Sequence, residues 1–304
     1  MTRKITISLL IALLLTTMSC VPGSGVSTSA GTANAPSSTI TMGNWLLEGT
    51  SELQHGSTES AGGALVSDGS NLSMSASFSG NCFYLPGALS GTMSGSTITL
   101  TSAPEYGRTL TISGTVYNNT NINGTFKIVG GTNSNCNGDY GTIYGVLIPV
   151  IAGNYTGNLQ EVPYPPPSDL TTLNTVALTL SLSQSNSPSA NGSFPLSGSA
   201  TLGVPPECTE AYPAGTNPPA YCLPTPPYSN SPCFSSGTID STQSSIQGSI
   251  LNLVIDTDTG DTVNITAQLQ NPNLATSMAV IGYQVNSGAC AYYSANGTPV
   301  LSRS

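Results

Sequence analysis

Apolar and small polar residues alternate over most of the chain beyond residue 43. In one of these segments Leu72, Met74, Ala76 and Phe78 alternate with serines. The same two-residue period recurs at 97–101, 109–113, 122–128, 176–182 and 263–269. A period of two places the apolar side chains on one face of a β-strand and the serines and threonines on the other, as in antiparallel sheets with one face in water. The pattern predicts an all-β protein.

Short segments rich in glycine, asparagine and aspartate separate the predicted strands at intervals of about 8–12 residues. They are Asp68-Gly69, Gly95-Ser96, Asn123-Gly124, Asn137-Gly138 and Thr259-Gly260-Asp261. Short turns between successive strands favour an antiparallel meander that closes into a small barrel, which leaves no exposed sheet edge. A β-sandwich is the alternative. The immunoglobulin type is disfavoured because the single tryptophan, Trp45, precedes Cys82 instead of lying between two cysteines.

A set of short motifs occurs twice in the same order. Each half opens with Gly-Asn and an aromatic residue, continues with Cys-Phe and Ser-Gly-Thr, and then has a second cysteine. The motifs begin at Gly43, Cys82, Ser90 and Cys136 in the first half and at Gly153, Cys233, Ser236 and Cys290 in the second. We therefore predict two tandem β-domains, residues 43–150 and 151–304. The Gly-x-Trp opening resembles that of lipocalins and avidin-like barrels, a resemblance of three residues per half that implies a meander.

The amino terminus has the layout of a secretory signal. A short basic start precedes an apolar stretch, Ile5–Leu15, that is too short to span a bilayer. The small residue before Cys20 resembles the lipobox of bacterial lipoproteins, although Thr17 stands where that family usually has leucine. The resemblance implies a signal peptide over residues 1–19 and a lipid on Cys20. Because Val21 is not aspartate, it also implies the outer membrane, with the protein facing the periplasm or the exterior.

Cysteine usage fits an exported protein. Seven cysteines minus the lipid-bearing Cys20 leave six, and an even number in an exported chain predicts disulfides. The repeat places two of the pairs, and the remaining two cysteines lie in sequence unique to the second half. The expected pairs are Cys82 with Cys136, Cys233 with Cys290, and Cys208 with Cys222.

Composition limits the partners. Only 6% of the residues are charged, and 5 lysines and arginines stand against 14 acidic residues, for a formal net charge of −9. Nucleic-acid binding needs clustered cations to neutralise phosphates, so this class is excluded. Residues 20–42 are rich in serine, threonine, glycine and alanine and predict a lipidated flexible tether. The expected partners are the membrane, through the lipid, and an envelope protein or glycan.

A proline-rich insertion interrupts the second half at residues 161–232. Its last part, from Pro205 to Pro232, is dense in proline, which excludes interior strands. Tyrosines there are amphipathic contact residues and form a candidate interaction surface. The alternative is that they pack on their own domain. These tyrosines are Tyr212, Tyr221 and Tyr228.

Candidate catalytic groups are sparse. The single histidine, His55, falls in a predicted turn, so we expect neither a catalytic base nor a zinc site. Glu48, Glu52 and Glu59 form a small acidic region that we interpret as a solvated face.

The densest group of charges is an acidic hairpin at residues 256–261. Its carboxylates, on Asp256, Asp258 and Asp261, are oxygen ligands of the kind that Ca²⁺ prefers. The spacing departs from an EF-hand loop, so a plain hairpin turn is the stronger interpretation. We expect no cofactor other than a weakly bound calcium ion at this hairpin.

These observations favour a non-enzymatic lipoprotein of the cell envelope that acts as a binding or structural surface module. A small-ligand carrier of lipocalin type is the alternative, because an eight-stranded barrel can hold one small ligand. An enzyme that acts on glycans through acidic residues is a third hypothesis. The bulky inward residues favour a filled barrel and thus the first hypothesis.

Overall fold

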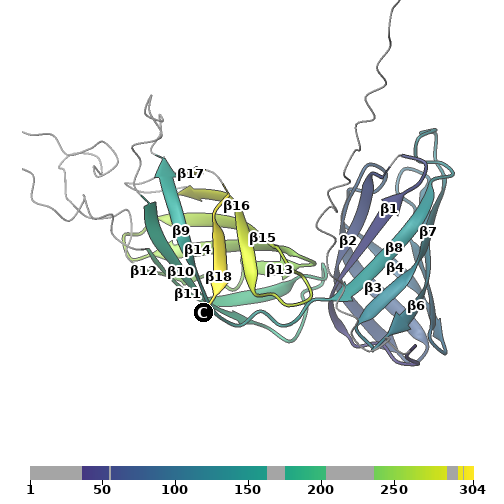
Figure 1. Ribbon diagram of the computed structural model, residues 1–304, viewed down its shortest axis with the longest axis horizontal. Coiled ribbons are helices and arrows are strands. Elements are labelled where there is room, and N and C mark those ends of the chain that lie inside the picture. Colours follow the sequence, from purple (N-terminus) through teal and green to yellow (C-terminus); the bar gives the residue numbers. More distant parts are fainter. Residues whose placement is uncertain (1–35, 55, 163–174, 203–235, 286–293, 297) are drawn as a thin grey trace, which may run out of the picture. The chain divides into compact units, whose positions relative to one another are not determined.

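The structure is a computed structural model that describes residues 36–54, 56–162, 175–202, 236–285, 294–296 and 298–304. Every regular element is a β-strand within these ranges, and the strands form two antiparallel barrels in tandem (Figure 1). The predicted all-β class is therefore confirmed, and the barrel is observed instead of the sandwich. No helix in the described part of the chain has the length and apolar character that a membrane span requires.

The first barrel is an up-and-down meander of eight strands. Its strands are β1 (Gly43–Ser51), β2 (Thr58–Asp68), β3 (Asn71–Ser79), β4 (Gly87–Ser94), β5 (Thr97–Ser102), β6 (Arg108–Tyr117), β7 (Asn121–Gly130) and β8 (Tyr140–Leu147). Each strand pairs with the next, and β8 pairs with β1 in a register that sets Leu147 opposite Trp45. Because successive strands run in opposite directions, the β1–β2, β3–β4, β5–β6 and β7–β8 connections lie at one end of the barrel. We call it the disulfide end.

Inward-facing side chains fill this barrel. The apolar positions of the predicted strand at 72–78 are all buried, each at most 5% exposed. They pack with Trp45, Leu89, Ile98, Leu100, Ile112, Ile122 and Phe126. The space left among Leu47, Phe78 and Phe126 is about 10 Å³. A space of that size is no larger than one water molecule needs, so it cannot hold an organic ligand.

The predicted turn at Asn123-Gly124 is wrong. Both residues lie inside β7, where the absence of a side chain lets β6 approach: a Cβ on Gly124 would collide with the carbonyl oxygen of Ser113. The chain reverses earlier, at Asn118 and Asn119, whose φ angles of 48° and 63° fit a two-residue hairpin turn.

The second barrel has ten strands that occupy eight positions. They are β9 (Gly153–Val162), β10 (Thr175–Gln184), β11 (Phe194–Leu202), β12 (Ser236–Ile239), β13 (Ser245–Gln247), β14 (Ile250–Thr257), β15 (Thr262–Leu269), β16 (Ser277–Val285), β17 (Ser294–Asn296) and β18 (Val300–Arg303). The short strands β12 and β13 share one position between β11 and β14, and β17 and β18 share another beside β16. The ring closes because β9 pairs with β10 on one side and with β17 and β18 on the other.

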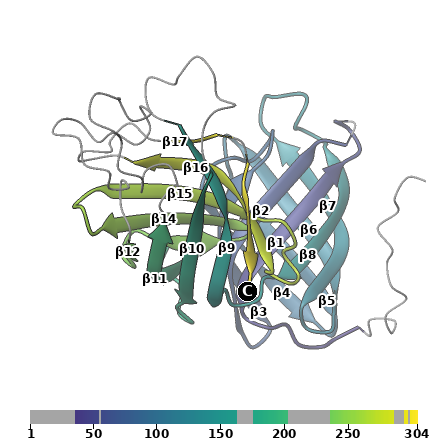
Figure 2. The ribbon, with the colours of Figure 1, turned by 60° about the vertical axis from the view of Figure 1, so that its left-hand side comes forward.

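The predicted insertion at 161–232 is too wide. Strands β10 and β11 fall within it, yet they belong to the barrel, where β10 pairs with β9 on one side and with β11 on the other (Figure 2). Their alternating apolar residues, such as Leu178 and Leu180, face the core and are fully buried. Alternation therefore identifies barrel strands even between proline-rich segments. Residues 163–174 and 203–235 lie outside the described residues.

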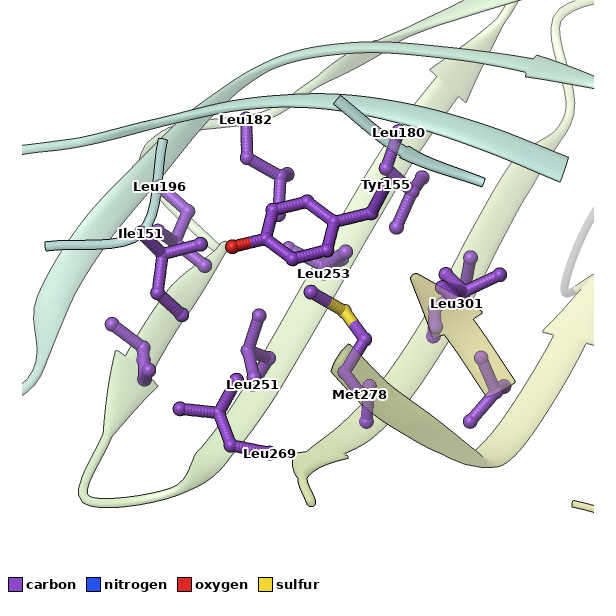
Figure 3. Packing of buried hydrophobic residues seen from close by; sticks show 14 of the residues in the cluster. Ile151, Tyr155, Leu180, Leu182, Leu196, Leu251, Leu253, Leu269, Met278 and Leu301 are labelled. Carbon is purple, nitrogen blue, oxygen red and sulfur yellow. The ribbon is translucent and has the colours of Figure 1, made fainter. Parts of the chain in front are cut away.

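Tyr155 lies at the centre of the second core. Its ring is surrounded by leucines that include Leu180, Leu182 and Leu253 (Figure 3). Its hydroxyl donates a 2.8 Å hydrogen bond to the carbonyl oxygen of Ala275. Burial raises the pKa of this hydroxyl, so it stays protonated and can donate. Tyr155 and Trp45 occupy equivalent positions of the two sequence repeats, and each is a buried aromatic residue of its barrel.

Candidate functional site

A disulfide joins two connections at the disulfide end of the first barrel. Cys82, in the β3–β4 connection, is bonded to Cys136, in the β7–β8 connection, with a Cα–Cα distance of 5.5 Å. Both residues are buried, so the bond lies inside the end of the barrel. This confirms the first of the pairs expected from the repeat. The cysteines of the other two predicted pairs, Cys208, Cys222, Cys233 and Cys290, and the expected lipid site, Cys20, lie outside the described residues.

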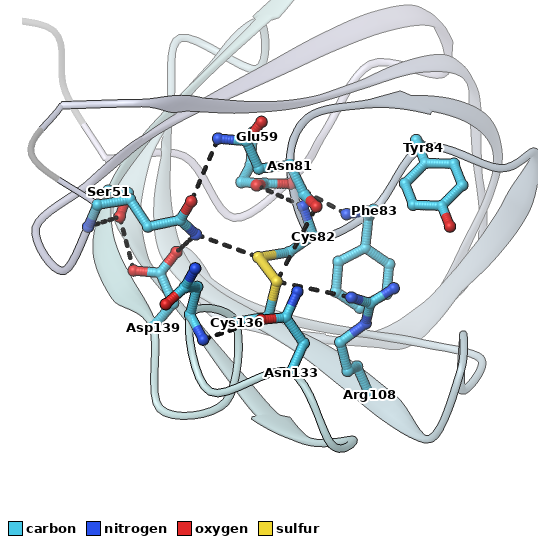
Figure 4. Close-up of a disulfide and its surroundings, with 12 residues drawn as sticks. Ser51, Glu59, Asn81, Cys82, Phe83, Tyr84, Arg108, Asn133, Cys136 and Asp139 are labelled. Carbon is cyan, nitrogen blue, oxygen red and sulfur yellow. Dashed lines mark hydrogen bonds between the residues drawn. A yellow bond between two sulfur atoms is a disulfide. The ribbon is translucent and has the colours of Figure 1, made fainter.

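Glu59 of β2 holds the loop that carries Cys82. Its carboxylate accepts the backbone N–H of Cys82 at 2.9 Å and that of Phe83 at 3.2 Å (Figure 4). A Cβ on Gly80 would collide with this carboxylate, so the loop can approach it because residue 80 is glycine. Glu59 is 6% exposed, and burial raises the pKa of its carboxyl group. The interpretation of Glu59 as part of a solvated face is therefore wrong.

A second buried carboxylate, that of Asp139, joins the β1–β2 and β7–β8 connections at the disulfide end. Asp139 is fully buried and accepts hydrogen bonds from the Ser51 hydroxyl at 2.7 Å and from the Gln54 amide at 3.0 Å (Figure 4). It also accepts the backbone N–H of Tyr140 at 2.8 Å. Asp139 thus connects the end of β1 to the start of β8, and its charge is satisfied by donors instead of facing solvent.

The β5–β6 turn presents an exposed tyrosine in a strained backbone conformation. Glu105 and Arg108 exchange backbone hydrogen bonds of 2.9 Å across the turn, and Tyr106 and Gly107 have φ angles of 50° and 76°. These are features of a type I′ turn, whose first central position favours asparagine, as at Asn118 in the β6–β7 turn. Tyr106 is nevertheless placed there, and its side chain is 66% exposed.

Tyr106 belongs to an aromatic cluster with a cation. Its ring stacks on that of Tyr84, with centroids 6.0 Å apart and an interplanar angle of 30°. The guanidinium carbon of Arg108 lies 5.5 Å from the Tyr106 ring centroid and 5.9 Å from that of Phe83. Arg108 also pairs with Glu105 at 4.0 Å and donates to the sulfur of Cys136 at 3.5 Å. The guanidinium group therefore braces the exposed rings against the disulfide.

A groove of about 300 Å³ lies beside this cluster. We call it the mouth groove. It is lined by the β3–β4 and β5–β6 connections and the strand ends next to them, and most of its side chains are apolar. Its larger lining residues are Phe78, Phe83, Leu85, Pro86, Pro104 and Tyr106, and Glu105 is the one charged residue among those described. The geometry suits a weakly charged ligand that offers apolar surface.

The structure does not bring the predicted calcium ligands together. Asp256 lies in β14, Asp258 accepts the Ser236 hydroxyl at 3.2 Å, and Asp261 is buried and accepts the Thr259 hydroxyl at 2.6 Å. Within the described ranges, no group of three or more histidine, cysteine, aspartate or glutamate residues is arranged to hold a metal ion. Weak calcium binding at this hairpin stays a prediction.

The predicted interaction surface and the mouth groove are different parts of the chain. The tyrosines Tyr212, Tyr221 and Tyr228 lie outside the described residues, and so does His55. The sequence analysis missed Tyr84, Tyr106 and Arg108. One signal was available: Tyr106-Gly107 lies between two alternating segments, so it marks a hairpin turn with an unusual exposed aromatic residue.

Comparisons with known proteins do not show a family. No family model and no curated protein matches the chain. Among solved structures, it is similar to a protein of unknown function of the DUF3598 family from Nostoc punctiforme, with 11% identity, coverage of 86% of this chain and 96% of that chain, and a TM-score of 0.22. It is also similar to a double mutant of transferrin binding protein B from Haemophilus parasuis, with 9% identity, coverage of 88% and 78%, and a TM-score of 0.22. At these scores neither likeness carries an argument about function.

Proposed function

We propose that the chain is a non-enzymatic binding module of the cell envelope. In this proposal a lipid on Cys20 anchors it, and the disulfide end of the first barrel contacts its ligand. The observation that carries the proposal is the stacked pair Tyr84–Tyr106, whose side chains are exposed beside an apolar groove. Exposed aromatic residues are enriched at sites where proteins bind partners.

The filled barrel supports a surface site over an internal one. A carrier of lipocalin type needs an interior cavity, whereas the space within the first barrel is about 10 Å³. The buried carboxylates at the disulfide end, Glu59 and Asp139, accept hydrogen bonds from the protein itself. They serve to hold loops in place, which supports binding over acid–base catalysis.

Membrane fractionation tests the anchor. The wild-type chain and Cys20→Ser are expressed in a bacterial host, and detergent-phase partitioning is measured. We expect Cys20→Ser to leave the membrane fraction. Continued partitioning of this variant into detergent would reject lipid attachment at Cys20.

Co-sedimentation with isolated envelope fragments tests the binding role. Purified Cys20→Ser chain is compared with the same chain carrying Tyr84→Ala and Tyr106→Ala. A matched control carries Tyr140→Thr, because Tyr140 is 55% exposed on the same barrel but does not line the groove. We expect the tyrosine pair, and not Tyr140, to be required for retention. Release of soluble sugars or peptides from the fragments by the purified chain would show an enzyme instead.

A further inference from the structure

A second concave surface, a cleft of about 210 Å³, lies where the two barrels meet. One wall is the outer face of β1, β2 and β3, and the other is the β13–β14 turn with the adjoining parts of β14 and β15. We call it the junction cleft. It shares no lining residue with the mouth groove, and its chemistry is different, because eight of its eleven lining residues carry polar side chains.

Direct contacts between the barrels fix the shape of the junction cleft. Asn44 is 2% exposed, and its side-chain amide donates to the carbonyl oxygen of Gly248 at 2.9 Å and accepts the N–H of the same residue at 2.8 Å. Gly62 lies so close to this turn that a Cβ on it would be 2.7 Å from the Cα of Gly248. The two barrels thus form one compact unit. Ligand pockets are usually preformed and often lie where domains meet, as this cleft does.

Several polar side chains of the junction cleft have no partner of their own. Within the described part of the chain, five of them make no hydrogen bond and no ion pair: Glu48, Ser77, Ser79, Ser249 and Gln268. Ser249 is only 6% exposed, so its hydroxyl has little access to bulk water. Buried polar groups in native proteins are normally hydrogen-bonded. The unpartnered groups on both walls therefore mark a place for a polar ligand.

The kinds of polar group in the junction cleft limit the charge of this ligand. Serine hydroxyls and glutamine and asparagine amides both donate and accept hydrogen bonds, whereas the carboxylate of Glu48 only accepts. No lysine or arginine lines the cleft, so Glu48 would repel an anion without compensation. An apolar ligand would leave the polar groups unpaired and shielded from water, which is costly. The complementary ligand is uncharged and carries several groups that both donate and accept.

A sugar ring meets these requirements. Each of its hydroxyls donates one hydrogen bond and accepts others, and its C–H groups form a small apolar face that the half-buried side chain of Ile250 can contact. An extended peptide would instead need the free edge of a sheet, which the closed first barrel does not offer because β1 pairs with both β2 and β8. The cleft of about 210 Å³ is smaller than the roughly 300–1,000 Å³ of pockets for drug-sized ligands, so it suits a short saccharide.

We infer that the junction cleft binds a short neutral saccharide of one or two rings. A sugar hydroxyl donates to the carboxylate of Glu48, and other hydroxyls exchange hydrogen bonds with Ser77 on one wall and with Ser249 and Gln268 on the other. This site goes beyond the proposed function, because it requires neither the lipid on Cys20 nor the mouth groove.

Saturation-transfer difference NMR on the purified Cys20→Ser chain tests this inference. The probes are the neutral disaccharides maltose, cellobiose and N,N′-diacetylchitobiose, with glucuronate as an anionic control and spermidine as a cationic one. We expect saturable binding of at least one neutral disaccharide and no saturable binding of glucuronate. Absence of saturable binding for all three disaccharides would overturn the inference, and so would binding of spermidine alone, because Glu48 would then act only as a charge.

Variants on the two walls locate the saccharide. Ser77→Val in β3 and Gln268→Leu in β15 each remove one hydrogen-bonding side chain and should each weaken disaccharide affinity at least about threefold. The matched controls Ser73→Val and Asn264→Leu lie at exposed positions of the same strands, outside the cleft lining, and should leave the affinity unchanged. Because all four positions are exposed, far-ultraviolet circular dichroism and the melting temperature should not change appreciably. Equal losses in wall and control variants would contradict the assignment.

The tyrosine pair separates this site from the mouth groove. Tyr84→Ala with Tyr106→Ala should abolish retention on envelope fragments and leave disaccharide affinity unchanged. Loss of disaccharide binding in this double variant, with Ser77→Val unaffected, would place the saccharide at the mouth groove and overturn the inference. Disaccharide binding that survives while the tyrosine pair proves irrelevant to retention would leave the junction cleft standing and refute the role of the mouth groove.

Discussion

The carboxylate of Glu59 accepts the backbone N–H of Cys82 at 2.9 Å, so a strand residue of β2 holds the loop that carries the disulfide. The same carboxylate accepts the N–H of Phe83, whose ring packs under Arg108 and lines the mouth groove. A change in the charge of Glu59 therefore acts on the disulfide loop and on one wall of the groove at once.

The stability of the protein should depend on pH through Glu59. Burial raises the pKa of Glu59 in the folded state above the ordinary 4.5, so the folded state binds the proton more tightly than the unfolded state. The cost of ionising the buried group is absent below pH 4.5 and is present in full above the folded pKa. Between these values the free energy of unfolding contributed by this group falls as the pH rises.

Urea unfolding at a series of pH values from about 4 to 7 measures this contribution, with Glu59→Gln as the non-titrating reference. We expect the wild type to lose stability relative to Glu59→Gln as the pH rises through this window. Glu48→Gln, at an exposed position of β1, is the matched control and should show a pH dependence close to that of the wild type. A constant difference between wild type and Glu59→Gln would contradict the prediction.

Replacing Arg108 should loosen the aromatic cluster. Arg108→Met keeps much of the length of the side chain but removes its ion pair with Glu105 and its cation–π contacts with Phe83 and Tyr106. We expect a loss of about 1–3 kcal/mol in the free energy of unfolding and a reduced near-ultraviolet circular dichroism of the tyrosines. Lys127→Met removes an exposed cation from β7 and should change neither signal appreciably. Equal effects of both variants would show that net charge, and not the cluster, matters.

Removing the first disulfide should destabilise the first barrel. Cys82 and Cys136 are separated by 54 residues, and closing a loop of that length contributes roughly 4 kcal/mol in the chain-entropy model. We expect Cys82→Ala with Cys136→Ala to lower the free energy of unfolding by about 2–4 kcal/mol, measured by urea denaturation. A loss below about 1 kcal/mol would mean that the unfolded chain is already compact around this pair.

Peptide mapping without reduction should find the remaining pairs predicted by the repeat. These are Cys233 with Cys290 and Cys208 with Cys222, all outside the described residues. Mass spectrometry of the protease fragments before and after reduction identifies each linked pair. A crosslink between a cysteine of the first half and one of the second would refute the assignment.

The sequence predicts the barrel well because strand alternation is a local property. Each of Leu72, Met74, Ala76 and Phe78 is buried as the pattern indicates, since residues two apart in a strand share a face. The turn at Asn123-Gly124 fails for a non-local reason, because Gly124 is required by the close approach of β6. In the sequence, an Asn-Gly pair whose glycine makes room for a neighbouring strand cannot be distinguished from an Asn-Gly pair that forms a turn.

The candidate site is harder to predict because it depends on contacts between distant segments. Glu59 has the surroundings of a surface residue in the sequence, yet its carboxylate is enclosed by the N–H groups of Cys82 and Phe83. Tyr84 and Tyr106 come from different connections and meet only when the barrel closes. By contrast, the disulfide between Cys82 and Cys136 is predictable from the sequence. The two repeats each carry a cysteine at the same two positions, so comparing the repeats indicates which cysteines pair.

Pairing of β1 with β8 sets Trp45 opposite Leu147, so the segment that forms the first barrel starts and finishes on neighbouring strands. A short linker can therefore join these two points, and the chain can instead be opened at Gly95, in the tight turn between β4 and β5. In such a circular permutant the β3–β4 and β5–β6 connections each remain within an unbroken hairpin. The connections that line the mouth groove thus stay intact although the strands follow one another in a different order along the polypeptide.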